Sequence, residues 1–145
     1  MLVCLHEEHT ISIVHGYAKV TEKPIATAVH ANVGLMHATM AIYNTWCEGI
    51  PIAVLGATGS LDASRRRSWM DWIQGQGTLI RPFVKFDDQP RSTNAAVKIL
   101  VQATANAMAK PGAPVYLCPD LSLQENKIGP ETLRYPGTTR YFNIS

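Results

Sequence analysis

Short apolar runs alternate with segments of helical periodicity along this chain of 145 residues, and this alternation limits the folds open to it. The run Ile52–Leu55 is apolar throughout and lies between Pro51 and Gly56, as a buried strand does. Similar runs predict strands at residues 1–5, 25–30, 82–86 and 114–118. Between the runs, apolar residues recur three and four positions apart, which predicts helices over residues 9–21, from 35 to a break at 49–51, and from 92 or 93 to 110. Alternating strands and helices predict an α/β fold of three layers, α/β/α, around a mostly parallel sheet.

The same patterns make three finer predictions. In the last helix, apolar spacing predicts a buried stripe of Val97, Leu100, Val101 and Met108. Residues 60–82 combine turn formers with Trp69 and Trp72, which predicts a loop with a short helix over the carboxyl edge of the sheet. Beyond residue 120 the sequence becomes polar, so we expect one domain over residues 1–120 and a linker or C-terminal strap over residues 121–145.

Composition narrows the classes of function. Charged residues make up 17% of the sequence, against about 25% in typical domains, so we expect other chain or another subunit to cover part of the surface. The net charge of +2 gives no case for nucleic-acid binding. The three cysteines are isolated in apolar settings, which predicts buried thiols in a reducing compartment, the cytoplasm. No apolar stretch approaches the ~18 residues of a membrane span, and the N-terminus lacks the basic region of a signal peptide.

The histidines near the N-terminus suggest a metal site first. His6, His9 and His15 lie close in sequence, and Glu7 follows His6. The helical zinc motif, however, needs its two histidines four residues apart, and position 10 is Thr. We therefore predict no metal ligand here and expect these histidines to lie on the surface and in a crevice. A metal site built from His6, His9 and His15 is the alternative.

Two other motifs allow a binding role beside a structural one. Gly56-Ala57-Thr58-Gly59 follows a strong strand as a nucleotide-binding turn does, but the dinucleotide fingerprint would need glycines where Ala57 and Asp62 stand. A plain tight turn is the alternative. Arg65-Arg66-Arg67 could bind a phosphate or a carboxylate, or could face solvent.

Glu7 and His30 form a better pair. Each follows a predicted strand, and the carboxyl ends of neighbouring parallel strands open into one crevice. A carboxylate beside an apolar wall and an imidazole that titrates near neutrality can share proton-transfer work. A helix-capping glutamate and a hydrogen-bonded histidine are the structural alternative, and spacing alone leaves both open.

An ordered series of motifs extends this pattern over roughly residues 1–120. They are His6-Glu7-Glu8, Gly16-Tyr17-Ala18-Lys19, Glu22-Lys23-Pro24, Val29-His30 with Gly34, Trp46, Ile50-Pro51, Arg81-Pro82-Phe83-Val84-Lys85-Phe86 and Gly112-Ala113-Pro114-Val115-Tyr116-Leu117. The series resembles the pyrimidine-binding domain of thiamine-diphosphate enzymes, in the group of acetolactate synthases and benzoylformate decarboxylases. An ordered series is far more specific than any one of its members.

The resemblance implies roles for four residues. Glu7 matches the glutamate that hydrogen-bonds the cofactor's aminopyrimidine and activates it, and His30 matches an active-site histidine of benzoylformate-decarboxylase-like members. Gly34 and His37 match positions that line the cofactor site. Two departures affect the pocket: the family often has Ser-Gly-Pro-Gly where this chain has Ala31-Asn32-Val33-Gly34, and commonly has Asn at position 37.

The resemblance also implies what lies outside this chain. The sequence has no Gly-Asp-Gly with a downstream Asn, the element that holds the diphosphate through Mg²⁺ in the family. The family's usual first strand and helix are missing as well, so we expect a fragment of a longer polypeptide or one subunit of a split enzyme. We expect thiamine diphosphate as the cofactor, a 2-oxo acid as the substrate and a homodimer or higher homo-oligomer through the cofactor crevice. A non-catalytic dimerisation module with the same fold is the alternative, and the resemblance implies nothing about a flavin.

Overall fold

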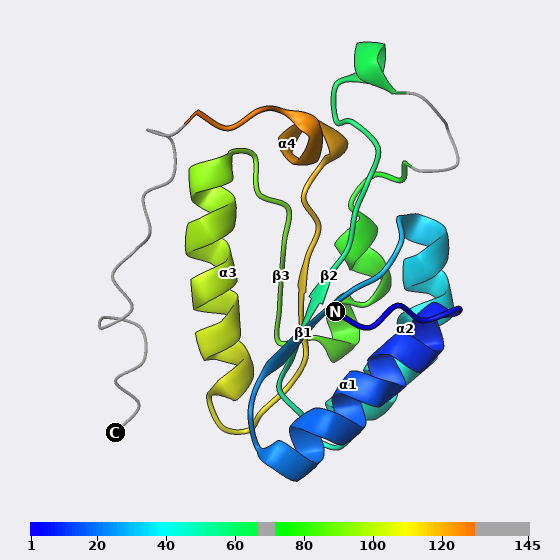
Figure 1. Ribbon diagram of the computed structural model, residues 1–145, viewed down its shortest axis with the longest axis vertical. Coiled ribbons are helices and arrows are strands. Elements are labelled where there is room, and N and C mark those ends of the chain that lie inside the picture. Colours follow the sequence, from blue (N-terminus) through cyan, green and yellow to red (C-terminus); the bar gives the residue numbers. More distant parts are fainter. Residues whose placement is uncertain (67–71, 130–145) are drawn as a thin grey trace.

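The computed structural model describes residues 1–66 and 72–129 and shows one parallel sheet between helices. The four strands of the sheet lie in the order β1-β2-β4-β3, and all neighbours are parallel. Their bounds are β1 (Ile25–Ala28), β2 (Ile52–Leu55), β3 (Phe86–Asp88) and β4 (Val115–Leu117). Helices α1 (Glu7–Thr21) and α2 (Asn32–Cys47) cover one face, and α3 (Thr93–Met108) covers the other (Figure 1). The predicted three-layer α/β/α fold is confirmed.

Each face of the sheet has its own core, because successive strand residues point to opposite sides. On the side of α1 and α2, Ile52, Val54 and Tyr116 are fully buried in one cluster. On the side of α3, a smaller cluster contains Ala53 and Val115 with other buried residues. The uniformly apolar strands follow from this double burial.

Two predicted strands are wrong or displaced. Residues 1–5 form no strand in the described structure, although their side chains favour one, because no strand lies beside them to supply ladder hydrogen bonds. The strand predicted at 82–86 begins only at Phe86, because Pro82 lies inside the short 3₁₀ helix η4 (Arg81–Phe83). Proline has no N–H to give to a ladder, and its fixed φ suits a helical turn.

The predicted buried stripe of α3 is also wrong. Its buried residues are Ala103 and Ala107, whereas Leu100 is 39% exposed. Small side chains let α3 approach the sheet closely, so the larger apolar residues lie to the side. The prediction chose large residues over alanines because hydrophobicity alone favours them.

The remaining segments carry short helices. The region after β2 contains η1 (Ala63–Arg65) and η3 (Gln76–Leu79) in addition to η4, and α4 (Leu121–Glu125) follows β4. Arg67, Trp69 and most of the predicted strap lie outside the described residues. Among the three cysteines only Cys118 is buried; Cys4 is half-buried and Cys47 is exposed, which corrects the prediction of buried thiols.

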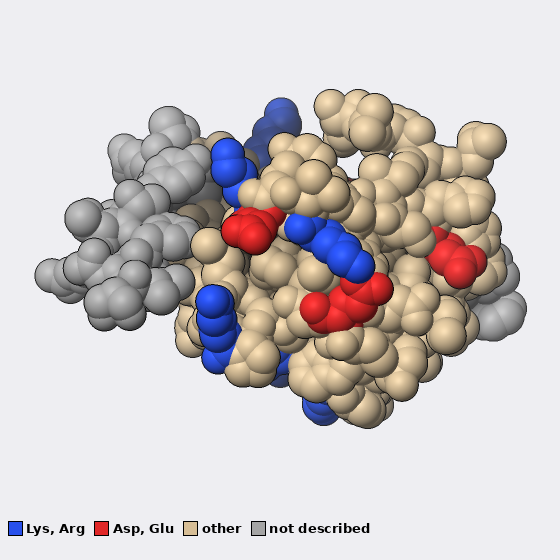
Figure 2. All heavy atoms as spheres, turned by 90° about the horizontal axis from the view of Figure 1, so that it is seen from below, with Lys and Arg blue, Asp and Glu red and all other residues tan. Residues whose placement is uncertain are grey.

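Charged side chains are sparse on the surface. On the face seen in Figure 2, basic and acidic groups interleave and are separated by wide uncharged areas. Within the described residues, no helix has the length and apolar character that crossing a membrane requires.

Candidate functional site

The first turn of α1 holds Glu7 in place. His6 is the N-cap: its backbone is extended, and its Nδ1 accepts a hydrogen bond from the Glu8 backbone N–H at 3.2 Å. Glu7 is thus the first helical residue, where the helix dipole favours a carboxylate. The helix begins two residues before its predicted start because a histidine side chain supplies the cap that Ser, Thr, Asp or Asn usually supplies.

The turn between β1 and α2 brings His30 to the same place. α2 begins at Asn32, only a few residues beyond the end of β1, so the chain reverses sharply. Gly34, in the first turn of α2, lies against both functional side chains. A Cβ atom on Gly34 would lie 2.8 Å from Glu7 Oε1 and 3.1 Å from His30 Cβ. Glu7 and His30 therefore come together around the missing side chain of Gly34.

His37 completes the cluster from one turn further along α2. Its Nδ1 lies 3.7 Å from Glu7 Oε2, and the two side chains are 52% and 25% exposed. The His6 ring stacks on the His37 ring at a centroid distance of 4.9 Å. All four predicted site residues thus meet, and His6 joins them. Sequence spacing alone gave no sign of the His6–His37 contact, because it joins two helices.

The structure brings together a different set of possible metal ligands from the one that the sequence suggested. His15 lies away from the cluster and contacts Glu48 Oε2 at 3.2 Å. Within the described residues, donor atoms of His6, Glu7 and His37 lie within 4.8 Å of one another. This set has the atom types that suit a transition metal, but His6 Nδ1 already caps α1.

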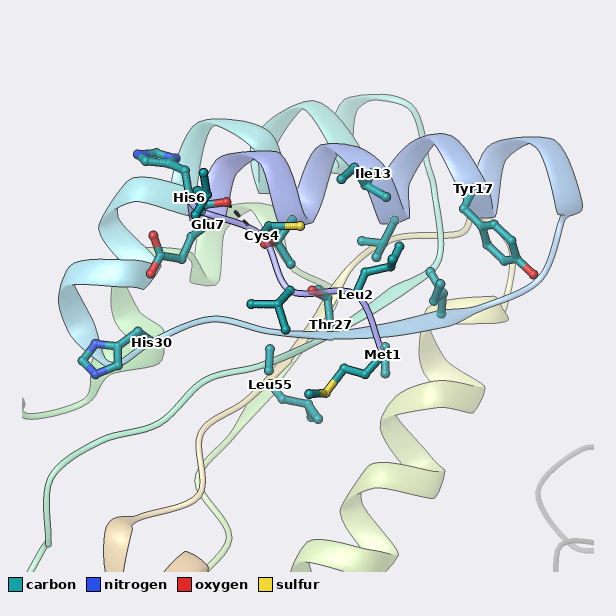
Figure 3. Close-up of a pocket in the computed structure, with 17 residues that line it drawn as sticks. Met1, Leu2, Cys4, His6, Glu7, Ile13, Tyr17, Thr27, His30 and Leu55 are labelled. Atoms are coloured by element: carbon teal, nitrogen blue, oxygen red, sulfur yellow. Dashed lines mark hydrogen bonds between the residues drawn. The ribbon is translucent and has the colours of Figure 1, made fainter.

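A groove of about 730 Å³ opens beside the cluster. Its walls are residues 1–5, one side of α1 and the free edge of β1. Figure 3 shows Glu7 and His30 at one end of the groove and Tyr17 at the other. The lining is mostly apolar, so the polar groups are concentrated at the end where α1 and α2 begin, as in many ligand sites.

Comparison with known proteins identifies the family. Residues 1–78 match the family described as "Thiamine pyrophosphate enzyme, N-terminal TPP binding domain". The chain belongs to this family. Glu7 and the residues around it, which are His6, His30, Gly34 and His37, all lie inside the matched range.

Decarboxylases are among the relatives of this TPP binding domain. Benzoylformate decarboxylase of Pseudomonas aeruginosa is 26% identical over 113 residues, which are 78% of this chain and 21% of that protein. Two solved structures share the fold. The 4-hydroxybenzoylformate decarboxylase of Rhodococcus jostii RHA1 has a TM-score of 0.73 at 22% identity, over 86% of this chain and 26% of that one. Benzoylformate decarboxylase from Polynucleobacter necessarius has a TM-score of 0.78 at 21% identity, over 92% of this chain and 25% of that one. The chain therefore spans about a fifth of the curated relative.

One residue of each of the other two motifs, Gly56 and Arg66, makes structural contacts in this TPP binding domain. A Cβ on Gly56 would lie 2.0 Å from Tyr116 Oη, so this glycine permits a close contact between neighbouring strands. The described residues that follow, up to 66, contain only the 3₁₀ turn η1, not the α-helix that a nucleotide turn needs. Arg66 donates to the Ser60 and Leu61 carbonyls and covers the Trp72 ring, which fixes the loop.

The residues present fit the aminopyrimidine of thiamine diphosphate. The missing side chain of Gly34 leaves room for the Glu7 carboxylate to lie against the first turn of α2, beside His30. Asn32 Oδ1 is buried nearby in sequence and has no hydrogen-bond partner among the described groups. A partly exposed carboxylate at the polar end of an apolar groove suits a flat ring that forms hydrogen bonds.

Proposed function

We propose that this chain is the pyrimidine-binding half of a thiamine-diphosphate-dependent 2-oxo-acid decarboxylase or carboligase. The observation that carries the proposal is the Glu7 carboxylate held against Gly34 beside His30, at the polar end of an apolar groove. The benzoylformate decarboxylases among its relatives support an aryl 2-oxo acid as the substrate class.

Glu7 is the residue that activates the cofactor. Its carboxyl group would form a hydrogen bond with a ring nitrogen of the aminopyrimidine, and partial burial would strengthen that bond. When bound, thiamine diphosphate would supply the nucleophile and the electron sink for loss of carbon dioxide. His37, 3.7 Å away, orients the carboxylate from α2.

His30 handles protons close to the substrate. It follows β1 at the end of the groove, its side chain is exposed to that space, and imidazole exchanges protons near neutral pH. The apolar wall of the groove lowers the polarity beside His30, which favours proton transfer between groups held in place.

The rest of the site comes from outside the described residues. A second domain or subunit binds the diphosphate through Mg²⁺, and a homodimer closes the crevice over Glu7. The enzyme works in the cytoplasm, where its free cysteines stay reduced.

Replacing Glu7 tests the proposal in the protein that carries this chain. Glu7→Gln keeps the shape of the side chain but removes its charge, so kcat for decarboxylation of benzoylformate should fall about 10³-fold while thiamine diphosphate still binds. Glu8→Gln is the matched control, because Glu8 is exposed on the same helical turn. Near-normal turnover by Glu7→Gln contradicts the assignment.

His30 is tested separately. His30→Ala should slow a proton-transfer step and remove one limb of the pH profile of kcat, with the cofactor affinity unchanged. If all steady-state constants stay within about twofold of wild type, the proposed role is wrong.

A further inference from the structure

Two histidines from different helices meet beside the Glu7 carboxylate. His6 caps α1, and His37 lies in the second turn of α2. Their rings are stacked, with the centroids 4.9 Å apart and the planes inclined by 16°. Within the described residues, one donor atom each of His6, Glu7 and His37 lies within 4.8 Å of the other two. These three residues are called here the His–Glu–His triad.

The triad has donor atoms that the fold does not use. The Nδ1 atom of His6 accepts the capping hydrogen bond from the Glu8 N–H, which leaves its Nε2 atom free. The Nδ1 atom of His37 lies 3.7 Å from Glu7 Oε2, which is beyond hydrogen-bond distance. Among the described residues, neither the Glu7 carboxylate nor the His37 ring takes part in a hydrogen bond. Three donors thus surround one point without binding one another.

The donor types select one class of metal ion. Two imidazole nitrogens and one carboxylate are the protein ligands of a well-known type of zinc site, in which water takes the fourth position. Mg²⁺ and Ca²⁺ prefer oxygen ligands, so two histidines would suit them poorly. The triad therefore favours Zn²⁺ or a related divalent transition metal ion.

The side chains need only small movements to close around such an ion. Ligand atoms of a tetrahedral zinc site lie about 3.3–3.6 Å from one another, and Glu7 Oε2 and His37 Nδ1 are already 3.7 Å apart. Both side chains are partly exposed, so they can rotate and an ion can enter from solvent. Figure 3 shows His6 and Glu7 projecting outward from the start of α1.

The helix dipoles act against a cation at this place, because α1 and α2 both begin beside the triad. Two carboxylates in the first turn of α1, those of Glu7 and Glu8, offset this effect. The dipole effect is also confined to the first turn of a helix, whereas His37 lies in the second turn of α2. The local charge therefore permits a divalent ion.

We propose that the free Nε2 of His6, the Glu7 carboxylate and His37 Nδ1 bind one Zn²⁺ or a related divalent transition metal ion, and that this ion competes with the cofactor. The competition rests on the proposed function, in which Glu7 meets the aminopyrimidine. Coordination withdraws negative charge from the carboxylate and adds an ion with its water beside it. The metal-bound form is thus a reversibly inhibited state of the site.

Co²⁺ is the probe for the metal site, because its visible absorption distinguishes a four-coordinate site from the hydrated ion. The protein that carries this chain is freed of cofactor and titrated in a background with Cys4→Ser and Cys47→Ser, which removes the accessible thiols of this chain. The triad should bind one Co²⁺ per chain, and Zn²⁺ should displace it. His37→Asn should weaken binding about 100-fold or more, since even the loss of a group behind a metal ligand costs about 10–100-fold.

His6→Asn and His9→Asn form a matched pair for the same titration. Asparagine is among the best N-cap residues, so His6→Asn keeps the start of α1 and removes only the imidazole. His9 is exposed on the same helix, 5.6 Å from His6 between ring centroids, but lies outside the triad. His6→Asn should lose the absorption of bound Co²⁺ and His9→Asn should keep it, with circular dichroism unchanged in both. A wild type without this absorption, or an equal loss in His9→Asn and His37→Asn, overturns the metal site.

Cofactor binding tests the competition. With Mg²⁺ held constant and free Zn²⁺ set by a chelator, the apparent Kd of thiamine diphosphate, measured by tryptophan fluorescence, should rise with free Zn²⁺ in the wild type. In His37→Asn it should not change, whereas Zn²⁺ bound to the diphosphate would affect both proteins equally. Co²⁺ binding at the triad without competition overturns the inhibition and contradicts the placement of the aminopyrimidine at Glu7. Failure of the Co²⁺ titration removes the metal site alone and leaves the proposed function standing.

Discussion

The carboxyl edge of the sheet is open at one end and closed at the other. Beside β1 the edge is open: Glu7 and His30 line a groove, His37 lies next to Glu7, and all three side chains are partly or largely exposed. At β2 and β4 the following loops are tied together: Thr58 pairs with Asp120 in an isolated bridge, and Asp120 is 6% exposed. The comparison shows that the candidate site lies at one end of the carboxyl edge, whereas the other end of the same edge is used for stability.

The closed end is held by specific polar contacts. Asp120 Oδ2 accepts from the Leu61 N–H and its Oδ1 from the Leu123 N–H, both at 3.0 Å, so one carboxylate joins two loops. Beneath it, Gln76 Nε2 donates to the buried Tyr116 hydroxyl at 2.9 Å. Burial raises the pKa values of Tyr116 and Cys118, so both stay neutral in the folded protein.

A side chain at position 56 should destabilise the closed end. In Gly56→Ala the new Cβ overlaps the Tyr116 hydroxyl, which Gln76 holds in place, so we expect a loss of about 3 kcal/mol in the free energy of unfolding by urea. Gly16→Ala is the control, because its Cβ meets open space and alanine favours a helix. Equal stability of Gly56→Ala and wild type would mean that the strands do not approach as closely as described.

The matching change at the open end should affect activity instead. In Gly34→Ala the new Cβ displaces the flexible end of Glu7, so kcat/KM of the protein carrying this chain should fall about 10–100-fold. The urea midpoint should change little, because the displaced carboxylate is partly exposed. A loss of stability without a loss of activity would reverse the contrast between the two ends.

Asp120→Asn should destabilise the closed end by a smaller amount than Gly56→Ala. Asparagine keeps one acceptor oxygen and loses the charge, so one backbone N–H loses its partner at a cost of about 1–2 kcal/mol. Asp62→Asn is a matched control: Asp62 also accepts from a backbone N–H, that of Ser64, but it is exposed. Asp120→Asn should therefore unfold at a lower temperature than Asp62→Asn. Equal midpoints of thermal unfolding would mean that Asp120 contributes only surface charge.

The sequence predicted the open end better than the closed one. His30 was predicted because it follows an apolar run that is a strand, whereas the prediction of Glu7 relied on a strand over residues 1–5 that does not form. Gly34 and His37 came from family resemblance, and only the structure shows why Gly34 must be small. The bond between Asp120 and the loop at Leu61 joins positions 59 residues apart and leaves no local pattern.

The fold was predicted where one physical rule decided the local structure. β2 has its predicted bounds because an apolar run between Pro51 and Gly56 leaves no alternative. Residues 1–5 and α3 were misjudged for a shared reason. Strand formation needs a neighbour, and helix burial depends on how close the sheet lies, so both are tertiary effects that residue type does not reveal.

The smallest expected effect is a difference in thiol reactivity between the two ends. Cys4 lines the groove and is half-buried, whereas Cys118 is buried beside Tyr116, and burial raises the pKa of its thiol. Because the thiolate is the reactive form and burial also restricts access, a chromogenic disulfide at pH 8 should modify Cys118 at least about tenfold more slowly than Cys4 in a Cys47→Ser background. Raising the pH above 9 lowers the free energy of unfolding, because Cys118 ionises more readily in unfolded molecules than in folded ones, so the difference between the two rates should become smaller. The slow phase must vanish in Cys118→Ser; if Cys118 reacts as fast as Cys4 at pH 8, the β4 end is not closed.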